Sequence, residues 1–202
     1  MNAGIAISAS KLTKRFGTFT AVDAIDLDVK QGEIFGFLGA NGAGKTTAMK
    51  MFIGLSKPTS GEATVAGFDV YTQSEEIKRN TGYMSQRFSL YNDLTVRENI
   101  RFYGGIYGLD DARLKQRTEQ MIEELGLTDH AKTLLASLPL GWKQKLAFSV
   151  ALIHEPRIVF LDEPTGGVDP ITRRQFWEMI YEASAKGVTV FVTAHYMDEA
   201  VY

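Results

Sequence analysis

One stretch of the sequence, from Gly39 to Thr46, combines residue types and a spacing suited to binding phosphate groups. Its sequence, GANGAGKT, matches the pattern G-x-x-x-x-G-K-[ST] at every fixed position. Glycines let the backbone curl so that successive N–H groups point at phosphate oxygens. We expect Lys45 to reach the β- and γ-phosphates of a nucleotide and the Thr46 hydroxyl to bind Mg²⁺. The predicted nucleotide-binding residues here are Gly39, Asn41, Gly42, Ala43, Gly44, Lys45, Thr46 and Thr47.

The sequence on either side supplies the elements that a phosphate-binding loop requires. Residues 33–38 form a short apolar run typical of a buried strand. Residues 45–54 have a helical pattern with Gly54 near its end. The N-terminus of such a helix offers free amides and a positive dipole end to an anion. The alternative is a structural glycine-rich turn, which gives no reason for the Lys-Thr pair.

Two consecutive acids, Asp162 and Glu163, follow a second apolar run. Four apolar residues precede Asp162, which is the Walker B arrangement of a carboxylate at the end of a buried strand. We expect Asp162 to hold Mg²⁺ beside the phosphate-binding loop. Glu163 is then placed to orient and polarise an attacking water. The alternative for Glu163 is a helix-capping or solvated acid.

Composition limits the remaining possibilities. The chain has 202 residues, 45% of them hydrophobic, which suits one α/β domain with a substantial insertion. Its formal net charge of -2 argues against a general nucleic-acid-binding surface. The absence of cysteine excludes disulfides and thiolate metal sites. No apolar run approaches the ~18 residues of a membrane span, so we expect any membrane role to come through a partner.

Periodic segments place both motifs on an α/β framework. We predict a turn with exposed aromatics at residues 16–19. Strands are predicted at residues 5–9, 24–29, 33–38, 62–67, 81–85, 157–162 and 188–193. Helices are predicted at residues 45–54, 75–79 and 172–186.

The segment between Gln86 and Pro156 has a helical character. Thr95 and Glu98 have the spacing of a capping box, which predicts the start of a helix. Gly104, Gly105 and Gly108 are expected to break this helix. The predicted helices are residues 95–103, residues 111–125 with Asp111 as the cap and Gly126 as the end, and residues 142–154.

Together these elements predict an α/β fold with a P-loop NTPase (RecA-like) core, an N-terminal antiparallel β subdomain and an inserted helical subdomain. The predicted division is residues 1–86 for the first part of the core, 87–154 for the helical subdomain and 155–202 for the rest of the core. A new helical pattern starts at Met197 just before the last residue, Tyr202. We therefore expect the full-length protein to continue beyond this chain.

Along essentially its whole length, the chain resembles the nucleotide-binding domain of ATP-binding cassette (ABC) transporters. The two motifs above match the family's Walker A and Walker B segments. The resemblance implies that Phe16 stacks on adenine, and that Gln86 contacts Mg²⁺ and the attacking water. It also implies that Glu163 is the catalytic glutamate, that Asp169 lies in the D-loop, and that His195 contacts the γ-phosphate. Taken singly, Phe16 could merely pack, a lone Gln is usually at the surface and a lone His is usually structural.

One family motif is altered in this chain. Where the family has LSGGQ, residues 138–142 are LPLGW, followed by Lys-Gln-Lys. Leu138 and Gly141 keep the family pattern and are predicted nucleotide contacts, whereas Pro139 lacks both a hydroxyl and an N–H. The variant resembles that of bacterial drug-efflux members. We expect the segment to approach a partner's ATP through backbone amides; the alternative is that it only packs, with Trp142 as an apolar anchor.

The resemblance implies an ATP-binding and ATP-hydrolysing subunit that powers a membrane exporter of drugs or other small molecules. The implied cofactors are ATP and Mg²⁺. The implied partners are a second nucleotide-binding domain, as a homodimer or a tandem or heteromeric pair, and integral membrane transporter subunits that dock near residues 86–94. The aromatics of that segment could instead belong to the core of the insertion. The implied location is the cytoplasmic face of the inner (plasma) membrane, with the isolated domain soluble.

Two other functions share these motifs. A soluble ABC ATPase of the translation-factor or DNA-repair type would remodel a macromolecule, but such proteins usually carry coiled coils, a charged linker or a second cassette. A scaffold with decayed hydrolysis is the other possibility. The presence of Glu163 and His195 argues against it.

Overall fold

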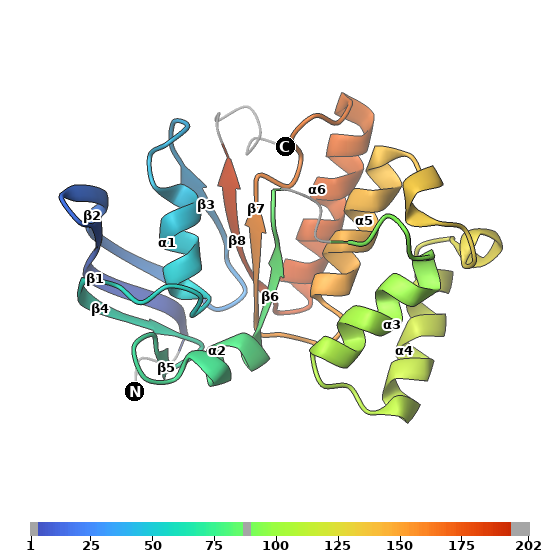
Figure 1. Ribbon diagram of the computed structural model, residues 1–202, viewed down its shortest axis with the longest axis horizontal. Coiled ribbons are helices and arrows are strands. Elements are labelled where there is room, and N and C mark those ends of the chain that lie inside the picture. The colour runs from blue at the N-terminus through green and yellow to red at the C-terminus, as the bar shows by residue number, and fades with distance from the viewer. Residues whose placement is uncertain (1–3, 87–89, 195–202) are drawn as a thin grey trace.

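The computed structural model describes residues 4–86 and 90–194, and Figure 1 shows two β-sheets with helices between and around them. One sheet is antiparallel and the other is parallel. This mixed α/β architecture confirms the predicted fold class. His195 and the helical pattern from Met197 lie outside the described residues.

The antiparallel sheet has the strand order β2-β1-β4-β5. Its elements are β1 (Ile5–Phe16), β2 (Phe19–Lys30), β4 (Ser60–Val65) and β5 (Phe68–Asp69). The first two strands are longer than predicted, because register shifts interrupt the two-residue alternation while the pairing continues. Lys11 and Ala24, with φ of 48° and 44°, lie at these irregularities. The turn between Phe16 and Phe19 is where the sequence predicts it.

The parallel sheet has the order β3-β8-β7-β6. Its strands are β3 (Ile34–Leu38), β6 (Thr81–Met84), β7 (Ile158–Asp162) and β8 (Thr189–Ala194). Because every pair is parallel, all four carboxyl ends meet at one edge of the sheet. The phosphate-binding loop follows β3 at this edge, Gln86 follows β6, and Asp162 ends β7.

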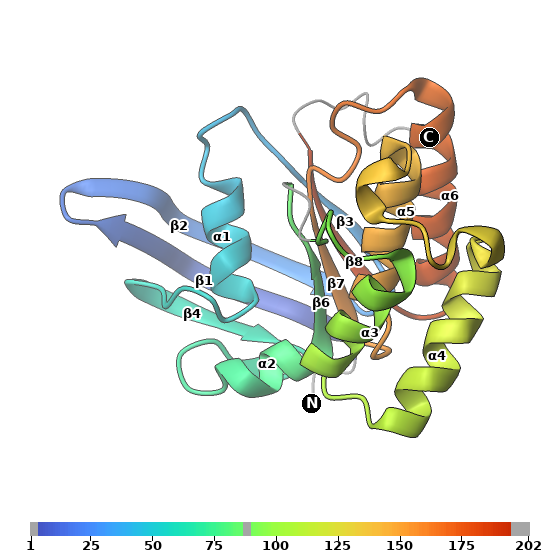
Figure 2. The same cartoon turned by 45° about the vertical axis from the view of Figure 1, so that its right-hand side comes forward.

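Helix α1 (Lys45–Phe52) packs between the two sheets, and α5 (Leu140–Ala151) and α6 (Pro170–Ala185) cover the opposite face of the parallel sheet (Figure 2). The alternation of β7 explains the two layers. Ile158 and Phe160 belong to the apolar core on the α1 side. Val159 and Leu161 belong to a second core that includes residues of α5 and α6.

The remaining helices lie before and within the segment that joins β6 to β7. They are α2 (Ser74–Asn80), α3 (Val96–Ile106) and α4 (Asp111–Glu124), with short 3₁₀ turns η1 (Thr128–His130) and η2 (Leu135–Ser137). The chain between β6 and β7 contains no strand among its described residues. The domain boundaries after residues 86 and 154 stay predictions.

The predicted break of α3 at Gly104 and Gly105 is wrong. The helix continues through both residues to Ile106, and the chain leaves it before Gly108, whose φ is 80°. A Cβ on Gly104 would collide with Leu114 of α4, so this glycine permits a close helix–helix approach. The capping box of Thr95 and Glu98 is confirmed.

Two other helix starts differ from the prediction. The side chain that caps α4 is that of Asp110, which accepts from the N–H of Arg113, rather than that of Asp111. Helix α5 begins at Leu140, two residues before the predicted start, with Pro139 as its N-cap. Proline there has φ −57° and ψ 151°, an extended conformation in which it can precede a helix without losing a backbone hydrogen bond.

Candidate active site

The phosphate-binding loop curls between β3 and α1. Gly42 and Gly44 have φ of 78° and 85°, in the left-handed region that glycine adopts at little cost. A Cβ on Gly44 would also collide with the carbonyl oxygen of Ala21 on β2. Any other residue at position 44 would therefore be strained in both conformation and space.

The Lys45 side chain points back into the curl of the loop. Its Nζ donates to the carbonyl oxygens of Gly39, at 2.5 Å, and Ala40, at 3.1 Å. It also lies 3.6 Å from Glu163 Oε1, and the side chain is only 5% exposed. The Lys45 ammonium, buried and held by carbonyl oxygens and a carboxylate, is therefore already positioned to bind an anionic ligand.

Asp162 and Thr46 meet at the start of α1. Thr46 Oγ1 donates to Asp162 Oδ2 at 2.9 Å, and Thr193 Oγ1 donates to Asp162 Oδ1 at 2.7 Å. The described residues include no cluster of three or more His, Cys, Asp or Glu side chains that could hold a metal by themselves. One carboxylate and one hydroxyl instead fit Mg²⁺, which takes one or two protein oxygens and completes its shell with phosphate and water.

Glu163 sits at the edge of the sheet with a left-handed backbone, φ 50°. Its N–H donates to both the carbonyl oxygen and the hydroxyl of Thr193 on β8. Its carboxylate accepts from Gln86 Nε2 at 2.5 Å. The structure therefore brings Lys45 and Gln86, which lie far away in the sequence, to the adjacent acids Asp162 and Glu163.

One tyrosine lies near this group without a place in the predicted chemistry. Burial raises the pKa of Tyr83 to about 12, and the Asp162 charge acts in the same direction. The phenol is therefore protonated near pH 7 and available only as a neutral hydrogen-bonding group.

A cavity of about 420 Å³ lies beside the phosphate-binding loop. Phe19, Val22 and Ala48 line it together with Gly42, Ala43 and Gly44. Phe16, the predicted adenine contact, does not line it; its ring is 56% exposed and has Lys14 Nζ at 5.1 Å from its centre. Phe19, which the sequence does not single out as a base contact, is 63% exposed and lies on the same hairpin turn as Phe16.

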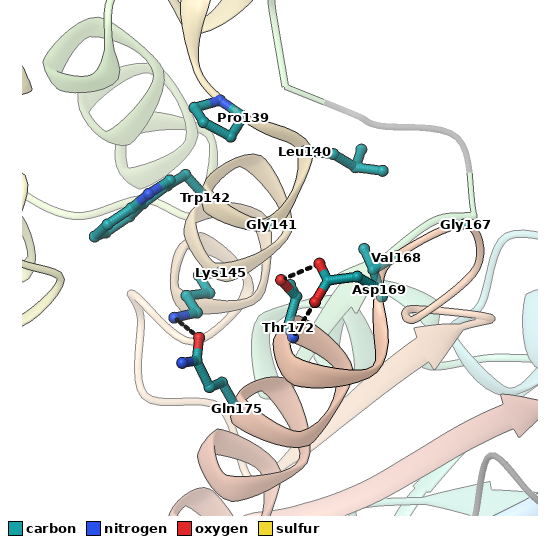
Figure 3. Close-up of a pocket in the computed structure, with 10 residues that line it drawn as sticks. All are labelled: Pro139, Leu140, Gly141, Trp142, Lys145, Gly167, Val168, Asp169, Thr172 and Gln175. Atoms are coloured by element: carbon teal, nitrogen blue, oxygen red, sulfur yellow. Dashed lines mark hydrogen bonds between the residues drawn. The ribbon is translucent and has the colours of Figure 1, made fainter.

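A second cavity, of about 460 Å³, lies at the N-termini of α5 and α6 (Figure 3). Leu140, Gly141 and Trp142 line it from α5, and Asp169 and other residues at the start of α6 line it from the other helix; the Leu140 side chain points toward the α6 start, whereas the Trp142 ring points away from it. Asp169 caps α6 by accepting from the N–H groups of Ile171 and Thr172. No side chain within residues 4–86 and 90–194 caps α5, so none of these satisfies the first amides of that helix.

Of the predicted nucleotide contacts in this region, some line the cavity and others do not. Gly141 and Asp169 line it, whereas Leu138 is 8% exposed and packs in the apolar core. His195 lies outside the described residues. Thr193 was missed, because a threonine inside a buried apolar strand has no sequence signal that marks it as a partner of Asp162.

Comparison with known proteins decides between the classes that share a phosphate-binding loop. The sequence profile of the ABC transporter family matches residues 22–166, which contain the loop, Gln86, Asp162 and Glu163. The chain belongs to the ABC transporter family. This ABC domain is similar over most of its length to many proteins.

The chain is 53% identical, over 97% of its length, to the probable multidrug ABC transporter ATP-binding protein YbhF of Escherichia coli K12, and covers 34% of that protein. It is 37% identical, also over 97% of its length, to the linearmycin resistance ATP-binding protein LnrL of Bacillus subtilis, and covers 63% of it. The ABC domain thus spans about a third to two thirds of these relatives.

Among solved structures, the fold matches cbiO1 from Clostridium perfringens, part of the ABC transporter complex cbiONQ, with a TM-score of 0.86. That match covers 96% of this chain and 80% of cbiO1 at 24% identity, and it supports the fold alone. Within residues 4–86 and 90–194 of the ABC domain, no helix has the length and apolar character needed to cross a bilayer.

Proposed function

We propose that this chain binds and hydrolyses ATP and thereby powers an ABC-type exporter of drugs or other small molecules. The observation that carries the proposal is the convergence of Lys45, Asp162 and Glu163 at one edge of the parallel sheet. Phosphoryl transfer to water needs a cation for the phosphates, a metal ligand and a group that activates the water. The buried Lys45, the Asp162 carboxylate bonded to Thr46 and the adjacent Glu163 carboxylate are suited to these three functions.

Each residue has a distinct proposed role. Lys45 exchanges its loop carbonyls and Glu163 for phosphate oxygens. Thr46, Asp162 and Gln86 are the proposed ligands of Mg²⁺, which when bound supplies positive charge to the phosphate oxygens. Glu163, released from Lys45, orients the attacking water and accepts its proton. His195 remains the proposed contact to the γ-phosphate.

The loop and its flanks supply the rest of the nucleotide site. The backbone amides of residues 39–47 are proposed to hold the phosphates at the N-terminus of α1. Phe16 is proposed to stack on the base, and Phe19 lines the cavity beside the loop at a place where it could contact the base as well. Base–aromatic stacking contributes about 1–3 kcal/mol where it has been measured by alanine substitution.

We infer the export role from the relatives, whose names describe multidrug and linearmycin resistance transport. The chain itself supplies no membrane span among its described residues, so the proposed partners are integral membrane subunits. The proposed location is the cytoplasmic face of the plasma membrane. No observation favours a soluble remodelling ATPase or a scaffold without hydrolysis.

The segment LPLGW is proposed to complete the ATP site of a second nucleotide-binding domain. The uncapped start of α5 faces the cavity of Figure 3, where an anion would meet free amides and the positive end of the helix. Asp169 and Gly141 are the proposed neighbours of that nucleotide. Leu138 would act only through its backbone, since its side chain is in the core.

The substitution Lys45→Ala tests the proposal in the full-length protein with its membrane partners. Each charge-assisted bond to phosphate contributes about 1.5–3 kcal/mol, so calorimetry should show at least a tenfold weaker affinity for Mg-ATP. ATP-driven drug efflux should be lost as well. Lys50→Ala is the matched control, because Lys50 is an exposed lysine at the other end of α1.

Unchanged ATP affinity in Lys45→Ala would overturn the phosphate-binding assignment. Normal ATP binding and turnover without any drug efflux or co-purifying membrane subunit would overturn only the export role.

A further inference from the structure

Gln144, on the second turn of α5, is a buried polar residue without a role in the chemistry described above. Its side chain is 3% exposed. Its carbonyl oxygen, Oε1, accepts no hydrogen bond from any of the described residues. Buried amide oxygens in folded proteins are nearly always satisfied, because leaving one without a donor destabilises the folded state. A vacant acceptor at this position therefore indicates a functional constraint.

The position of Gln144 in the fold indicates what that constraint is. It lines a cavity of about 400 Å³ together with Gln86 and Glu163, the two residues that are bonded to each other at the sheet edge. Met84, Ser85, Pro164 and Gly166 complete the lining of the same cavity. Helix α5, which carries Gln144, begins at the LPLGW segment.

The donors around this cavity narrow the choice of partner for Oε1. Pro164 has no N–H, and the N–H of Gly166 already donates to the carbonyl oxygen of Glu163 at 3.2 Å. The Gln86 amide has two N–H bonds, and one of them donates to Glu163 Oε2. The Gln86 amide therefore brings a second N–H to the cavity that Gln144 also lines.

We propose that Gln144 is a positioning residue that takes over the Gln86 amide when nucleotide binds, and thereby releases the Glu163 carboxylate. This inference rests on the proposed ATP hydrolysis. In the nucleotide-free chain, the Gln86 amide donates to Glu163 Oε2 and so occupies a carboxylate oxygen that an attacking water would need. Transfer of that amide to Gln144 Oε1 satisfies the buried acceptor and frees Glu163 to accept a proton from water.

The proposal also gives α5 a way to influence hydrolysis. Gln144 lies two residues after Trp142, so a shift of α5 when its N-terminus engages a partner's nucleotide moves Gln144 relative to Gln86. The release of Glu163 then depends on the state of the partner site.

The test is Gln144→Met in the full-length protein assembled with its membrane partners. Methionine has a similar length and volume but no amide, and removing a buried acceptor together with its need for a donor leaves the fold as stable or more stable. We expect the nucleotide-free melting temperature to be unchanged or higher, and the affinity for a non-hydrolysable ATP analogue to change less than threefold. We expect kcat to fall at least about tenfold with little change in KM. Gln120→Met, at an exposed position on α4, is the matched control.

A double variant shows whether Gln144 acts through Gln86. In Gln86→Ala there is no amide to transfer, so adding Gln144→Met should reduce kcat no further. Losses that multiply in the double variant would overturn the proposal, and so would parental turnover in Gln144→Met. A lower melting temperature with a parallel loss of analogue binding would show a purely structural role and also overturn it. If Gln144→Met does not fold, Gln144→Leu is judged by the same measurements.

Failure of this proposal differs from failure of the ATPase assignment. Lys45→Ala with unchanged ATP affinity removes the assignment itself. Normal ATP binding together with unaltered turnover in Gln144→Met removes only the role of Gln144.

Discussion

At the scale of single residues, Lys45 and Gln86 compete for the Glu163 carboxylate before any nucleotide is bound. Lys45 attracts it from the α1 side and Gln86 donates to it from the end of β6. Its backbone has φ 50°, a conformation that costs a side chain larger than glycine on the order of 1–2 kcal/mol. The two bonds from its N–H to Thr193 offset that cost. The site therefore holds a strained residue in place by bonds at both its backbone and its side chain.

Glu163→Gln should separate binding from hydrolysis. The amide keeps the size of the side chain but loses the charge, so it cannot accept a proton from water. We expect ATP to bind at least as well as in the parent and turnover to fall about 10²–10⁴-fold. Equilibrium binding and steady-state hydrolysis in the full assembly measure the two effects. A variant that hydrolyses ATP at the parental rate would show that Glu163 is not the base.

How far the sequence predicts the site depends on the kind of residue. The loop, Asp162 and Glu163 are predictable, because a fixed spacing and an apolar strand constrain them locally. Thr193, Phe19 and Gln144 are not, because their roles arise from contacts between segments far apart in the chain. Only the folded sheet brings Thr193 of β8 next to Asp162 of β7.

At the scale of elements, the uncapped start of α5 allows a test of backbone recognition. Leu140→Pro places proline at the first helical position, where it fits, and removes only one N–H. If that amide donates to a partner's phosphate, ATP-driven association and turnover of the full assembly should fall at least about tenfold. Leu140→Ala keeps the N–H and should behave nearly as the parent. Equal activity of the two variants would contradict recognition through this amide.

Gly141 is a less suitable position for that test. A Cβ there would lie 2.6 Å from Thr172 Cγ2. A larger residue such as Asp would push α5 away from α6 whether or not nucleotide binds. A loss of activity on substitution of Gly141 would therefore not distinguish disturbed packing of α5 on α6 from lost contact with nucleotide.

Two strand glycines of the parallel sheet provide a stability prediction with a built-in control. A Cβ on Gly82 of β6 would collide with the backbone carbonyl of Ala151 at the end of α5, whereas Gly36 of β3 has nothing within 4 Å of its Cβ position. Neither has a positive φ. We expect Gly82→Ala to lower the free energy of unfolding by about 2–3 kcal/mol and Gly36→Ala to lower it by less than about 0.5 kcal/mol. Denaturant titration measures both, and equal effects would contradict the close approach of α5 to β6.

Some element boundaries could not be predicted for a similar reason. A glycine usually ends a helix, but Gly104 continues α3 because α4 needs the space that a side chain would take. The hairpin strands extend past their alternating pattern because bulges at Lys11 and Ala24 shift the register. Both outcomes depend on a neighbouring element, which the local sequence does not reveal.

At the scale of the whole molecule, His154 ties the end of the helical segment to the parallel sheet. Its Nε2–H donates to the carbonyl oxygen of Thr81 on β6, since a carbonyl can only accept. Its ring stacks on Tyr107 with centroids 3.8 Å apart and an interplanar angle of 11°. Nδ1 is buried without a partner among the described residues. Protonation of Nδ1 would place an unpaired charge in this contact.

This contact predicts a sensitivity to acid. Burial lowers the pKa of His154 from its ordinary 6.5 to about 4. Between these values the unfolded chain binds a proton that the folded chain does not, so stability is retained above pH 6.5 and lost as the pH falls toward 4. By linkage, this group should cost on the order of 2 kcal/mol of stability at about pH 5.

The substitution His154→Phe keeps the stacked ring and removes the titration. We expect the melting temperature of the parent to fall more between about pH 7.5 and pH 5 than that of His154→Phe. His130→Phe, at an exposed position in η1, is the control and should follow the parent. Equal acid sensitivity of the parent and His154→Phe would show that His154 is not its source.

The parallel sheet also separates the α1 side of the molecule from the α5 side. Successive residues of β7 face opposite sides, and at its end Asp162 bonds to Thr46 on the α1 side while Glu163 lines the cavity on the α5 side. Asp162 and Glu163, which are neighbours in the sequence, therefore contact residues on opposite sides of the sheet. The Lys45–Glu163 ion pair crosses the end of the sheet between these two sides. The order of the two acids is consequently as important as their presence. In a chain with one residue more or fewer in β7, both carboxylates would still be present, but each would lie on the wrong side of the sheet.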